Sequence, residues 1–350
     1  MLTDHEFVRA WLGARAAEIG IDRDSLSVVS IAALSRGVSR QTWSVVVEDR
    51  SGRTELAVRR DHEVGSVIPT SLRTEFDVYS ALAGTAVPHA QALMWEDDPT
   101  WMPDGRPAYV RAMVDGDWRL PELDGDPASN ASARIGLARE HIDKLAMVHG
   151  VDWRKAGFGH ILAVPPTSIN AAEFMIDDVM AQLTRHGASP SIAAAEAVAT
   201  MRKSAPSDLE ELVLCKGTNG HGEEVWRDNR IVAMSDWELA AIGDPAYDFV
   251  QCQELLADIV VDGRQVWGMK HALDYYRETT GRVITPGRIE FYRALLALLQ
   301  HVYTQHSAQV VKRLSYPPLR FVWTATEVAF RNEIRLAAGY AGDLLTEAVA

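Results

Sequence analysis

The sequence of 350 residues is 47% hydrophobic and 24% charged, and its formal net charge at pH 7 is −13. This length supports a sizeable core and predicts two domains or lobes, and the composition is that of an ordinary soluble globular protein. The acidic charge argues against nucleic acid or an anionic membrane as a partner, because either needs a basic protein face, and any bound phosphate must meet local cations.

The chain starts without the basic and then apolar layout of a signal peptide, and no apolar run approaches the about 18 residues of a membrane span. We therefore expect a cytoplasmic protein with no membrane partner. The first predicted element is an amphipathic helix that begins at Thr3, which forms a capping box with Glu6, and that ends at Gly20.

A β-hairpin is predicted next, with its strands at residues 27–34 and 42–47. Its tip contains two arginines and two small residues, Arg36, Gly37, Ser39 and Arg40. Backbone N–H groups of such a tip can approach the phosphates of a nucleotide, and the arginines suit phosphate oxygens. The alternative is a plain turn whose arginines face water.

A third strand, at residues 56–60, ends in Arg59, and the helix predicted for residues 71–82 carries Glu75 in its first turns. A hairpin, a strand with a cation and a helix with a glutamate follow one another in the small lobe of kinase-like proteins, where the glutamate holds the cation that meets the nucleotide phosphates. A surface salt bridge is the alternative.

Two further strands, at residues 88–95 and 107–113, complete a predicted five-stranded sheet. The chain is then expected to cross into a second lobe, which divides it into domains at residues 1–115 and 116–350. Helical patterns dominate the second domain, at residues 133–149, 171–185, 191–203, 247–258, 264–279, 286–306 and 319–338. His149 ends the first of these helices and is interpreted as a core or cap histidine.

The most informative stretch runs from Leu214 to Glu238, as strand, loop, strand, turn and strand, followed by the carboxylate of Asp236. Kinase-like enzymes use such paired short strands to deliver polar groups to a catalytic loop and a metal-binding Asp. The only cysteines, Cys215 and Cys252, lie in or near this stretch, and their apolar contexts predict buried, reduced thiols.

Taken together, these stretches resemble the aminoglycoside phosphotransferase and choline kinase family, most closely the branch similar to the kinase-like domain fused to some acyl-CoA dehydrogenases. The resemblance covers about residues 29–256. It is carried by RGVSRQT at 36–42, VR at 58–59, TEF at 74–76, LAMVH at 145–149 and DWELAAIGDP at 236–245, followed by Asp248.

The resemblance implies an α+β, protein-kinase-like two-lobe fold, with an antiparallel sheet in the small lobe and a mostly helical large lobe. It implies a phosphotransferase that uses ATP or another nucleoside triphosphate, Mg²⁺ and a small-molecule hydroxyl substrate; a homodimer is one assembly we consider. Asp236 inherits the role of metal ligand, and the nucleotide-binding positions are Arg36, Gly37, Ser39, Arg40, Arg59 and Glu75.

The catalytic loop departs from the family pattern HGDxxxxN, because Lys216-Gly217-Thr218 and Glu223 occupy the aligned positions. Thr218 replaces the base, and a hydroxyl carries no proton acceptor of useful pKa near neutral pH. Glu223 still offers an oxygen to Mg²⁺, so a metal site formed by Asp236 and Glu223 is expected to survive.

Three hypotheses follow for this loop. The first is a small-molecule kinase in which Glu223, Glu224 or His221 takes the proton. The second is a catalytically inactive protein that binds a nucleotide or another ligand. The third is an enzyme of changed chemistry that uses Lys216, His221, Glu223 and Glu224, and we expect these four side chains to present charge to the cleft.

Overall fold

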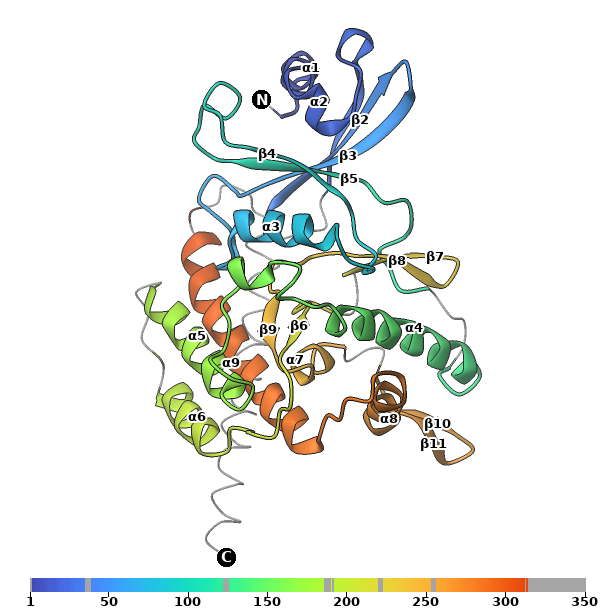
Figure 1. The fold of residues 1–350 in the computed structure, drawn as a ribbon, viewed down its shortest axis with the longest axis vertical. Helices are drawn as coiled ribbons and strands as arrows, with labels where there is room; N and C mark the ends of the chain where they lie inside the picture. Colours follow the sequence, from blue (N-terminus) through green and yellow to red (C-terminus); the bar gives the residue numbers. More distant parts are fainter. Residues whose placement is uncertain are drawn as a thin grey trace, which may run out of the picture.

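A five-stranded antiparallel sheet forms the upper lobe of the molecule in the computed structural model (Figure 1), which describes residues 2–34, 39–121, 126–185, 190, 192–219, 223–252, 256–311 and 313. The strand order is β1-β2-β3-β5-β4. The strands are β1 Ser27–Leu34, β2 Gln41–Asp49, β3 Gly52–Arg60, β4 Ala92–Glu96 and β5 Ala108–Ala112. The predicted hairpin and sheet are thus confirmed.

The N-terminal helical segment packs against this sheet. It consists of α1, His5–Ala14, and α2, Ala16–Ile19, and a 3₁₀ turn, η1, follows at Arg23–Ser25. The predicted start at Thr3 is wrong, because the side chain of Asp4 accepts the N–H groups of Glu6 and Phe7 and is the N-cap. The predicted single helix is also interrupted at Arg15, while Gly20 ends the segment with φ 73° as expected.

Apolar side chains that alternate along the strands form the core of the small lobe. Val45 and Val47 on β2 and Leu56 and Val58 on β3 are buried with Trp11 of α1. Because neighbouring side chains on a strand point to opposite faces, this pattern leaves Arg59 on the other face of β3 from Val58. That face is the one from which the functional site is built.

Helix α3, Leu72–Leu82, lies between the sheet and the rest of the molecule (Figure 1). Ser71 caps it by accepting the backbone N–H of Thr74. Glu75 and Tyr79, one turn apart, are both buried although each carries a polar group. Their polar atoms therefore need partners from the neighbouring elements.

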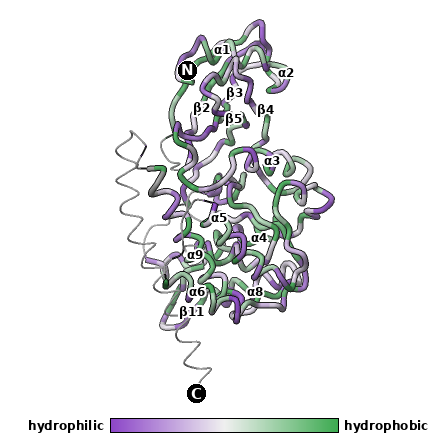
Figure 2. The backbone as a smooth tube through the Cα atoms, turned by 90° about the vertical axis from the view of Figure 1, so that its left-hand side faces the viewer, coloured by the Kyte–Doolittle hydropathy of each residue, from purple (hydrophilic) through white to green (hydrophobic). Residues whose placement is uncertain are grey.

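The large lobe below is mostly helical, and it stays separate from the sheet along the long axis in the view turned by 90° (Figure 2). Its helices are α4 Ala131–His149, η2 Phe158–His160, α5 Ala171–Arg185, α6 Ile192–Lys203, α7 Ala246–Phe249, α8 Met269–Thr280 and α9 Pro286–Val311. Three antiparallel strand pairs accompany them: β6 Val213–Cys215 with β9 Ala241–Gly243, β7 Glu224–Arg227 with β8 Arg230–Met234, and β10 Ile259–Val261 with β11 Arg264–Trp267. None of the helices described is both long and apolar enough to span a membrane.

Two of the predicted helices are wrong in part. Of the pattern at residues 247–258, the described part (247–252 and 256–258) contains only the short helix α7, and residues 264–267 form strand β11 before α8 begins. Asp262 and Gly263, with φ of 50° and 74°, form the turn between β10 and β11, and an Asp-Gly pair is a strong hairpin signal that outweighed the helical pattern. The predicted helix at 319–338 lies outside the described residues.

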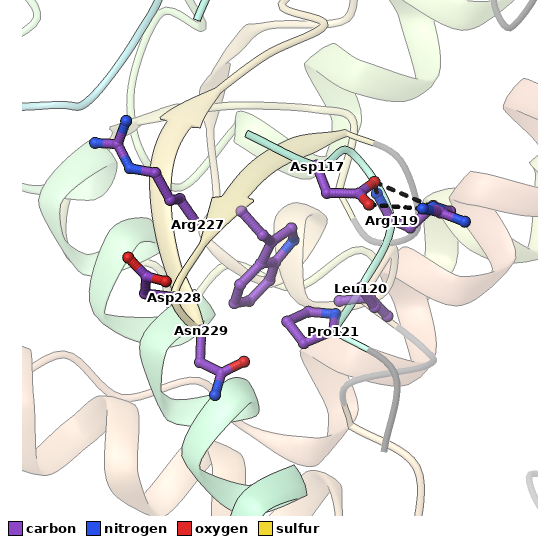
Figure 3. A pocket seen from close by; sticks show the side chains of 8 residues that line it. Asp117, Arg119, Leu120, Pro121, Arg227, Asp228 and Asn229 are labelled. Atoms are coloured by element: carbon purple, nitrogen blue, oxygen red, sulfur yellow. Dashed lines mark hydrogen bonds and ion pairs between the residues drawn. The ribbon is translucent and has the colours of Figure 1, made fainter. Parts of the chain in front are cut away.

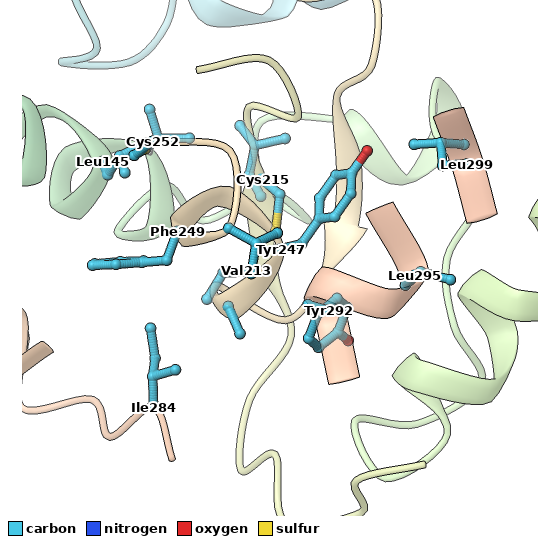
Figure 4. Close-up of a cluster of buried hydrophobic side chains, with 14 of the residues drawn as sticks. Leu145, Val213, Cys215, Tyr247, Phe249, Cys252, Ile284, Tyr292, Leu295 and Leu299 are labelled. Carbon is cyan, nitrogen blue, oxygen red and sulfur yellow. The ribbon is translucent and has the colours of Figure 1, made fainter. Parts of the chain in front are cut away.

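Strand β6 and helix α7 enter the core of the large lobe (Figure 4). Cys215, Tyr247 and Phe249 pack there with side chains of α9, among them Tyr292 and Leu295. Both cysteines are buried and free, as predicted. Burial raises the pKa of each thiol well above its ordinary value.

Candidate functional site

Three charged side chains from distant segments meet where the two lobes touch. Arg59 of β3 lies 3.3 Å from Glu75 of α3 and 3.3 Å from Asp236, which follows β8. Asp236 is 177 residues from Arg59 in the chain. The cation and the aspartate that the resemblance assigns to the nucleotide phosphates and the metal are therefore in contact.

Two tyrosines hold the carboxylates of this group in place. The hydroxyl of Tyr109 on β5 donates to Glu75 Oε1 at 3.0 Å, and the hydroxyl of Tyr79 on α3 accepts the backbone N–H of Asp236 at 3.1 Å. Burial raises the pKa of Tyr79 to about 12, so its hydroxyl stays neutral. The small lobe thus positions Asp236 through its backbone as well as through Arg59.

Asp236 has a backbone conformation that few residues adopt. Its φ is 62°, which places it in the left-handed region, where aspartate is tolerated better than most residues. The next residue, Trp237, is fully buried, and its indole N–H donates to the Met234 carbonyl at 2.9 Å. This anchored turn directs the Asp236 side chain, of which 27% is exposed, away from the core.

Glu223 lies beside Asp236, because its backbone carbonyl accepts both the N–H and the hydroxyl of Ser235, at 2.9 and 3.0 Å. Burial and the charge of Asp236 raise the pKa of Glu223 to about 9. Burial opposes the ionisation of Asp236, but Arg59 and the hydrogen bond with Glu223 outweigh it and lower the pKa of Asp236. At neutral pH the pair therefore shares one proton between two carboxylates.

Arg40 belongs to an inward-facing ion cluster in this structure. Its side chain is fully buried and contacts Asp61 at 2.7 Å, Glu238, and the carbonyl of Thr70 at 2.6 Å. Burial and the charge of Asp236 raise the pKa of Glu238 to about 7. Ser39, also buried, accepts a hydrogen bond from Arg59 at 3.3 Å, whereas Arg36 and Gly37 lie outside the described residues. The nucleotide-binding role of these residues stays a prediction.

The catalytic loop is anchored from below by Asp248 of α7. This fully buried carboxylate accepts the backbone N–H groups of Lys216 and Gly217, both at 2.8 Å, and the side-chain amide of Asn219 at 3.0 Å. His149, at the end of α4, adds a hydrogen bond at 2.9 Å. His149 is thus a core histidine that holds the anchor.

From the sequence, Asp248 was only part of a motif and His149 only a core or cap histidine. Neither was predicted to hold the loop. One signal was present, because Asp248 is the only charged residue between Pro245 and Val250. A carboxylate in such an apolar run is buried only with several hydrogen-bond donors around it. The identity of those donors could not be deduced, since they come from segments far away in the chain.

Lys216 and Glu224 are fully buried, so the expectation that they present charge to the cleft is wrong for these two residues. Lys216 Nζ lies 3.7 Å from Glu224, and Glu224 lies 3.0 Å from Nε2 of His141 on α4. The charged groups pair with one another inside the lobe because an isolated buried charge is costly. Whether they act in catalysis stays a prediction, and His221 lies outside the described residues.

Thr218 stands at the position of the family's base. Its hydroxyl donates to the backbone carbonyl of Asp236, and Lys216 Nζ donates to the carbonyl of Thr218 and lies 3.4 Å from its hydroxyl. Gly217 has φ of 83°, and a Cβ added there would lie 1.9 Å from the Leu239 carbonyl oxygen. Only glycine therefore lets the loop pack this closely on the segment after Asp236.

A separate hollow of about 380 Å³ lies beside the crossing between the lobes (Figure 3). It is lined on one side by Asp117, Arg119, Leu120 and Pro121, and on the other by Trp226, Arg227, Asp228 and Asn229 at and near the turn between β7 and β8. Asp117 and Arg119 form an ion pair at its edge (Figure 3). None of the predicted site residues that the structure describes lines this hollow.

A family model described as "Phosphotransferase enzyme family" matches residues 30–283 of this chain. A search of curated proteins by sequence finds no match. Among solved structures, the chain is similar to a protein from Ralstonia eutropha JMP134 assigned as an aminoglycoside phosphotransferase, with a TM-score of 0.68 and 20% identity over 97% of this chain and 98% of that one.

Two other similar structures are those of antibiotic phosphotransferases. A thermostable mutant of aminoglycoside phosphotransferase APH(4)-Ia has a TM-score of 0.59 and 14% identity over 96% of this chain and 99% of that one. Macrolide 2′-phosphotransferase MphH from Brachybacterium faecium has a TM-score of 0.50 and 18% identity over 88% of this chain and 98% of that one. Another mutant of APH(4)-Ia was solved as a ternary complex with ADP and hygromycin B. These similarities confirm the predicted kinase-like fold.

Proposed function

This chain belongs to the phosphotransferase enzyme family, and from that membership we propose that it transfers the γ-phosphate of ATP, or of another nucleoside triphosphate, to a hydroxyl group of a small molecule. The observation that carries the proposal is the contact of Arg59 with both Glu75 and Asp236. Kinase-like enzymes need the same three charges, a cation for the phosphates, a glutamate that holds it and an aspartate for the metal.

The carboxylate pair of Asp236 and Glu223 fits a divalent metal. Both residues supply oxygen ligands, and the charge of Asp236 that raises the pKa of Glu223 is one that a cation between the two carboxylates would offset. Mg²⁺, when bound, would neutralise the developing charge on the phosphate oxygens. We assign Asp236 and Glu223 as the residues that would hold it.

The chain's own residues then position the reactants. Arg59 would orient the phosphates while Glu75 keeps the Arg59 guanidinium in place. The hydrogen bonds of Asp248 hold the loop at residues 216–219 in a fixed position relative to Asp236. Phosphoryl transfer has a loose transition state and demands little activation of the nucleophile, so positioning and charge carry most of the catalysis. Loss of the base is therefore compatible with slow transfer.

A second candidate function is nucleotide binding without transfer, and the surroundings of Thr218 favour it. Its hydroxyl donates to the backbone carbonyl of Asp236, and the Lys216 ammonium lies 3.4 Å from that hydroxyl. No proton acceptor of the usual kind thus stands at the base position among the residues described. The third hypothesis, changed chemistry at Lys216, His221, Glu223 and Glu224, would require an acid–base set of which two members are buried.

Isothermal titration with ATP in the presence and absence of Mg²⁺ tests the nucleotide site. We expect Mg²⁺-dependent binding that Asp236→Asn weakens at least about tenfold, because one anionic ligand is lost. Asp262→Asn, at a turn distant in sequence from the site, is the matched control. Folded wild-type protein that binds no ATP with Mg²⁺ would contradict both candidate functions.

Restoring the family residues separates the two candidates. The double variant Thr218→Asp and Glu223→Asn regains the family's base and metal asparagine. Transfer is followed as ADP release with a panel of alcohols. A slow kinase should show turnover in the wild type that the double variant keeps or raises, whereas a pure nucleotide binder should show none in the wild type.

A further inference from the structure

A pocket of about 300 Å³ lies next to the proposed reaction site, and we name it the α5–α9 pocket. Its walls come from α5, α9, the start of α3 with the loop before it, and residues 238–242. The segment 238–242 follows Asp236 directly. The pocket is therefore bounded by the same strand connection that carries the proposed metal ligand.

Two contacts join this pocket to the site. Glu238, which lines the pocket, lies 3.8 Å from Arg59, and Arg59 lies 3.3 Å from Asp236. Leu239 also lines the pocket, and its backbone carbonyl packs on Gly217 of the catalytic loop. A molecule in the α5–α9 pocket would thus be separated by a single side chain, that of Glu238, from Arg59, which is proposed to bind the phosphates.

Most of the side chains that line the pocket are apolar. They include Phe174 and Met175 of α5, Leu295 and Leu299 of α9, and Ile161. Among the lining residues that the structure describes, two are charged, Asp178 and Glu238, and none is cationic. An anionic ligand would have to be buried here without a counter-ion, which is strongly unfavourable.

The two carboxylates do not form a free acidic cluster. Glu238 is paired with the buried Arg40 and accepts a hydrogen bond from Thr70 at 3.0 Å. Asp178 accepts the side-chain amide of Gln182 at 2.9 Å, lies 3.8 Å from the Arg185 guanidinium and is 45% exposed. A ligand with several positive charges would therefore find one partly free carboxylate at most.

Gln182 adds a polar atom that has no partner. Its Oε1 is buried and accepts no hydrogen bond, while its amide nitrogen is engaged by Asp178. Buried polar atoms normally have partners, so a rotation of the Gln182 side chain that turns this acceptor toward the pocket would offer it to a donor from a ligand. A hydroxyl group or a single ammonium group would satisfy it.

We infer that the acceptor is an alcohol with a largely apolar body that is neutral or carries one positive charge, and that anionic and polycationic compounds are excluded. This inference rests on the proposed function, because it assigns the α5–α9 pocket to the molecule that receives the phosphate. The apolar walls, the absence of a lining cation among the described residues and the free acceptor of Gln182 together specify this class.

The test uses three probes of one length that differ in charge: 1,8-octanediol, 8-amino-1-octanol and 8-hydroxyoctanoate. Binding to the full chain without nucleotide is measured by NMR titration. We expect the neutral and cationic probes to bind at least about tenfold more tightly than the anionic probe, since only the latter buries an uncompensated charge. Equal affinity for 8-hydroxyoctanoate, or no binding of the diol, would overturn the inference.

Two variants with matched controls locate the binding. Ala163→Trp places a large side chain at an exposed position of the pocket wall and should weaken diol binding at least about fivefold by steric exclusion. The control Ala10→Trp, at an exposed position on α1, should leave diol binding unchanged. Asp178→Lys should reverse the preference in favour of 8-hydroxyoctanoate, whereas Asp177→Lys, its neighbour on α5 that does not line the pocket, should leave the preference unchanged. An unchanged response to both pocket variants would place the probes elsewhere and refute the inference.

The proposed function fails by a different result. It is contradicted when folded protein binds no Mg²⁺-dependent ATP, a measurement that needs no acceptor. Diol binding that responds to Ala163→Trp would still support the inferred ligand class in that case.

Discussion

Replacing Asp248 by Asn tests whether the buried anchor holds the catalytic loop. The carboxylate accepts four hydrogen bonds, two on each oxygen: from Gly217 and Asn219 on Oδ1, and from Lys216 and His149 on Oδ2. In either orientation, the side-chain amide of the substituted asparagine directs its N–H groups at two of these donors, and donors cannot hydrogen-bond to each other. His149 can relieve one such conflict by changing its tautomer, so one or two hydrogen bonds are lost.

The magnitude follows from this count. A hydrogen bond to a charged group contributes about 1.5–3 kcal/mol, so the loss of one or two predicts a destabilisation of about 2–5 kcal/mol. Burial opposes the ionisation of Asp248, but the hydrogen bond from His149 and the backbone N–H groups lower its pKa. The stabilisation is therefore present at neutral pH and is lost only as the pH falls through this lowered pKa, below the usual range of an aspartate.

Urea unfolding followed by tryptophan fluorescence measures the effect, because Trp237 is buried beside the loop. The matched control is Asp274→Asn, an exposed aspartate on α8 that contacts Lys270 at 2.8 Å and should contribute about 0–1 kcal/mol. If Asp248→Asn cost no more than the control, the hydrogen bonds would not hold the loop and the argument would be refuted.

Three further predictions concern the loop and the small lobe. Gly217→Ala should lower the unfolding free energy by about 3 kcal/mol or more, because φ is positive and a Cβ would lie 1.9 Å from a backbone oxygen. The control Gly263→Ala, where φ is positive but the space is open, should lower it by about 1 kcal/mol. Equal losses of the two variants in urea unfolding would contradict this explanation. Lys216→Met should destabilise by about 3–5 kcal/mol, because it removes the cation beside the buried Glu224 and leaves that carboxylate with its contact to His141, and adding Glu224→Gln should recover about 1–3 kcal/mol. Strictly additive effects in the double-mutant cycle would show that Lys216 and Glu224 are uncoupled. Glu96→Gln should lower the unfolding free energy by about 2 kcal/mol at pH 7. Hydrogen bonds outweigh burial and lower the pKa of Glu96, so this loss should shrink as the pH falls through that pKa. A loss that stays independent of pH down to the acid transition would show that the ionised Glu96 does not stabilise the fold.

Local patterns in the sequence predicted much of the small lobe. The runs of β-forming residues at 42–47 and 56–60 predicted the strands, and Ser71 marked the start of α3. These features depend on residues close together in the chain, so they can be recognised without tertiary information. The choice of Asp4 over Thr3 as the N-cap could not be recognised from the sequence, because two adjacent residues of suitable type compete for one position.

The family resemblance, read from motifs alone, predicted the fold and named Arg59 and Asp236 as site residues. It also located the altered loop and gave the identity of the substituted residues. Short motifs can do this because the geometry of kinase-like sites assigns each residue type to a set position.

The tertiary structure alone decided how the charges in the loop are used. Glu224 is buried against His141, which lies 83 residues away, and Arg40 is buried against Glu238, which lies 198 residues away. A sequence shows that an ionisable group exists but not whether a counter-charge reaches it, and that partner determines whether the group faces water or the core. The sequence by itself therefore determined which chemical groups this site contains, and the packing of distant segments determined which of them pair inside the lobe.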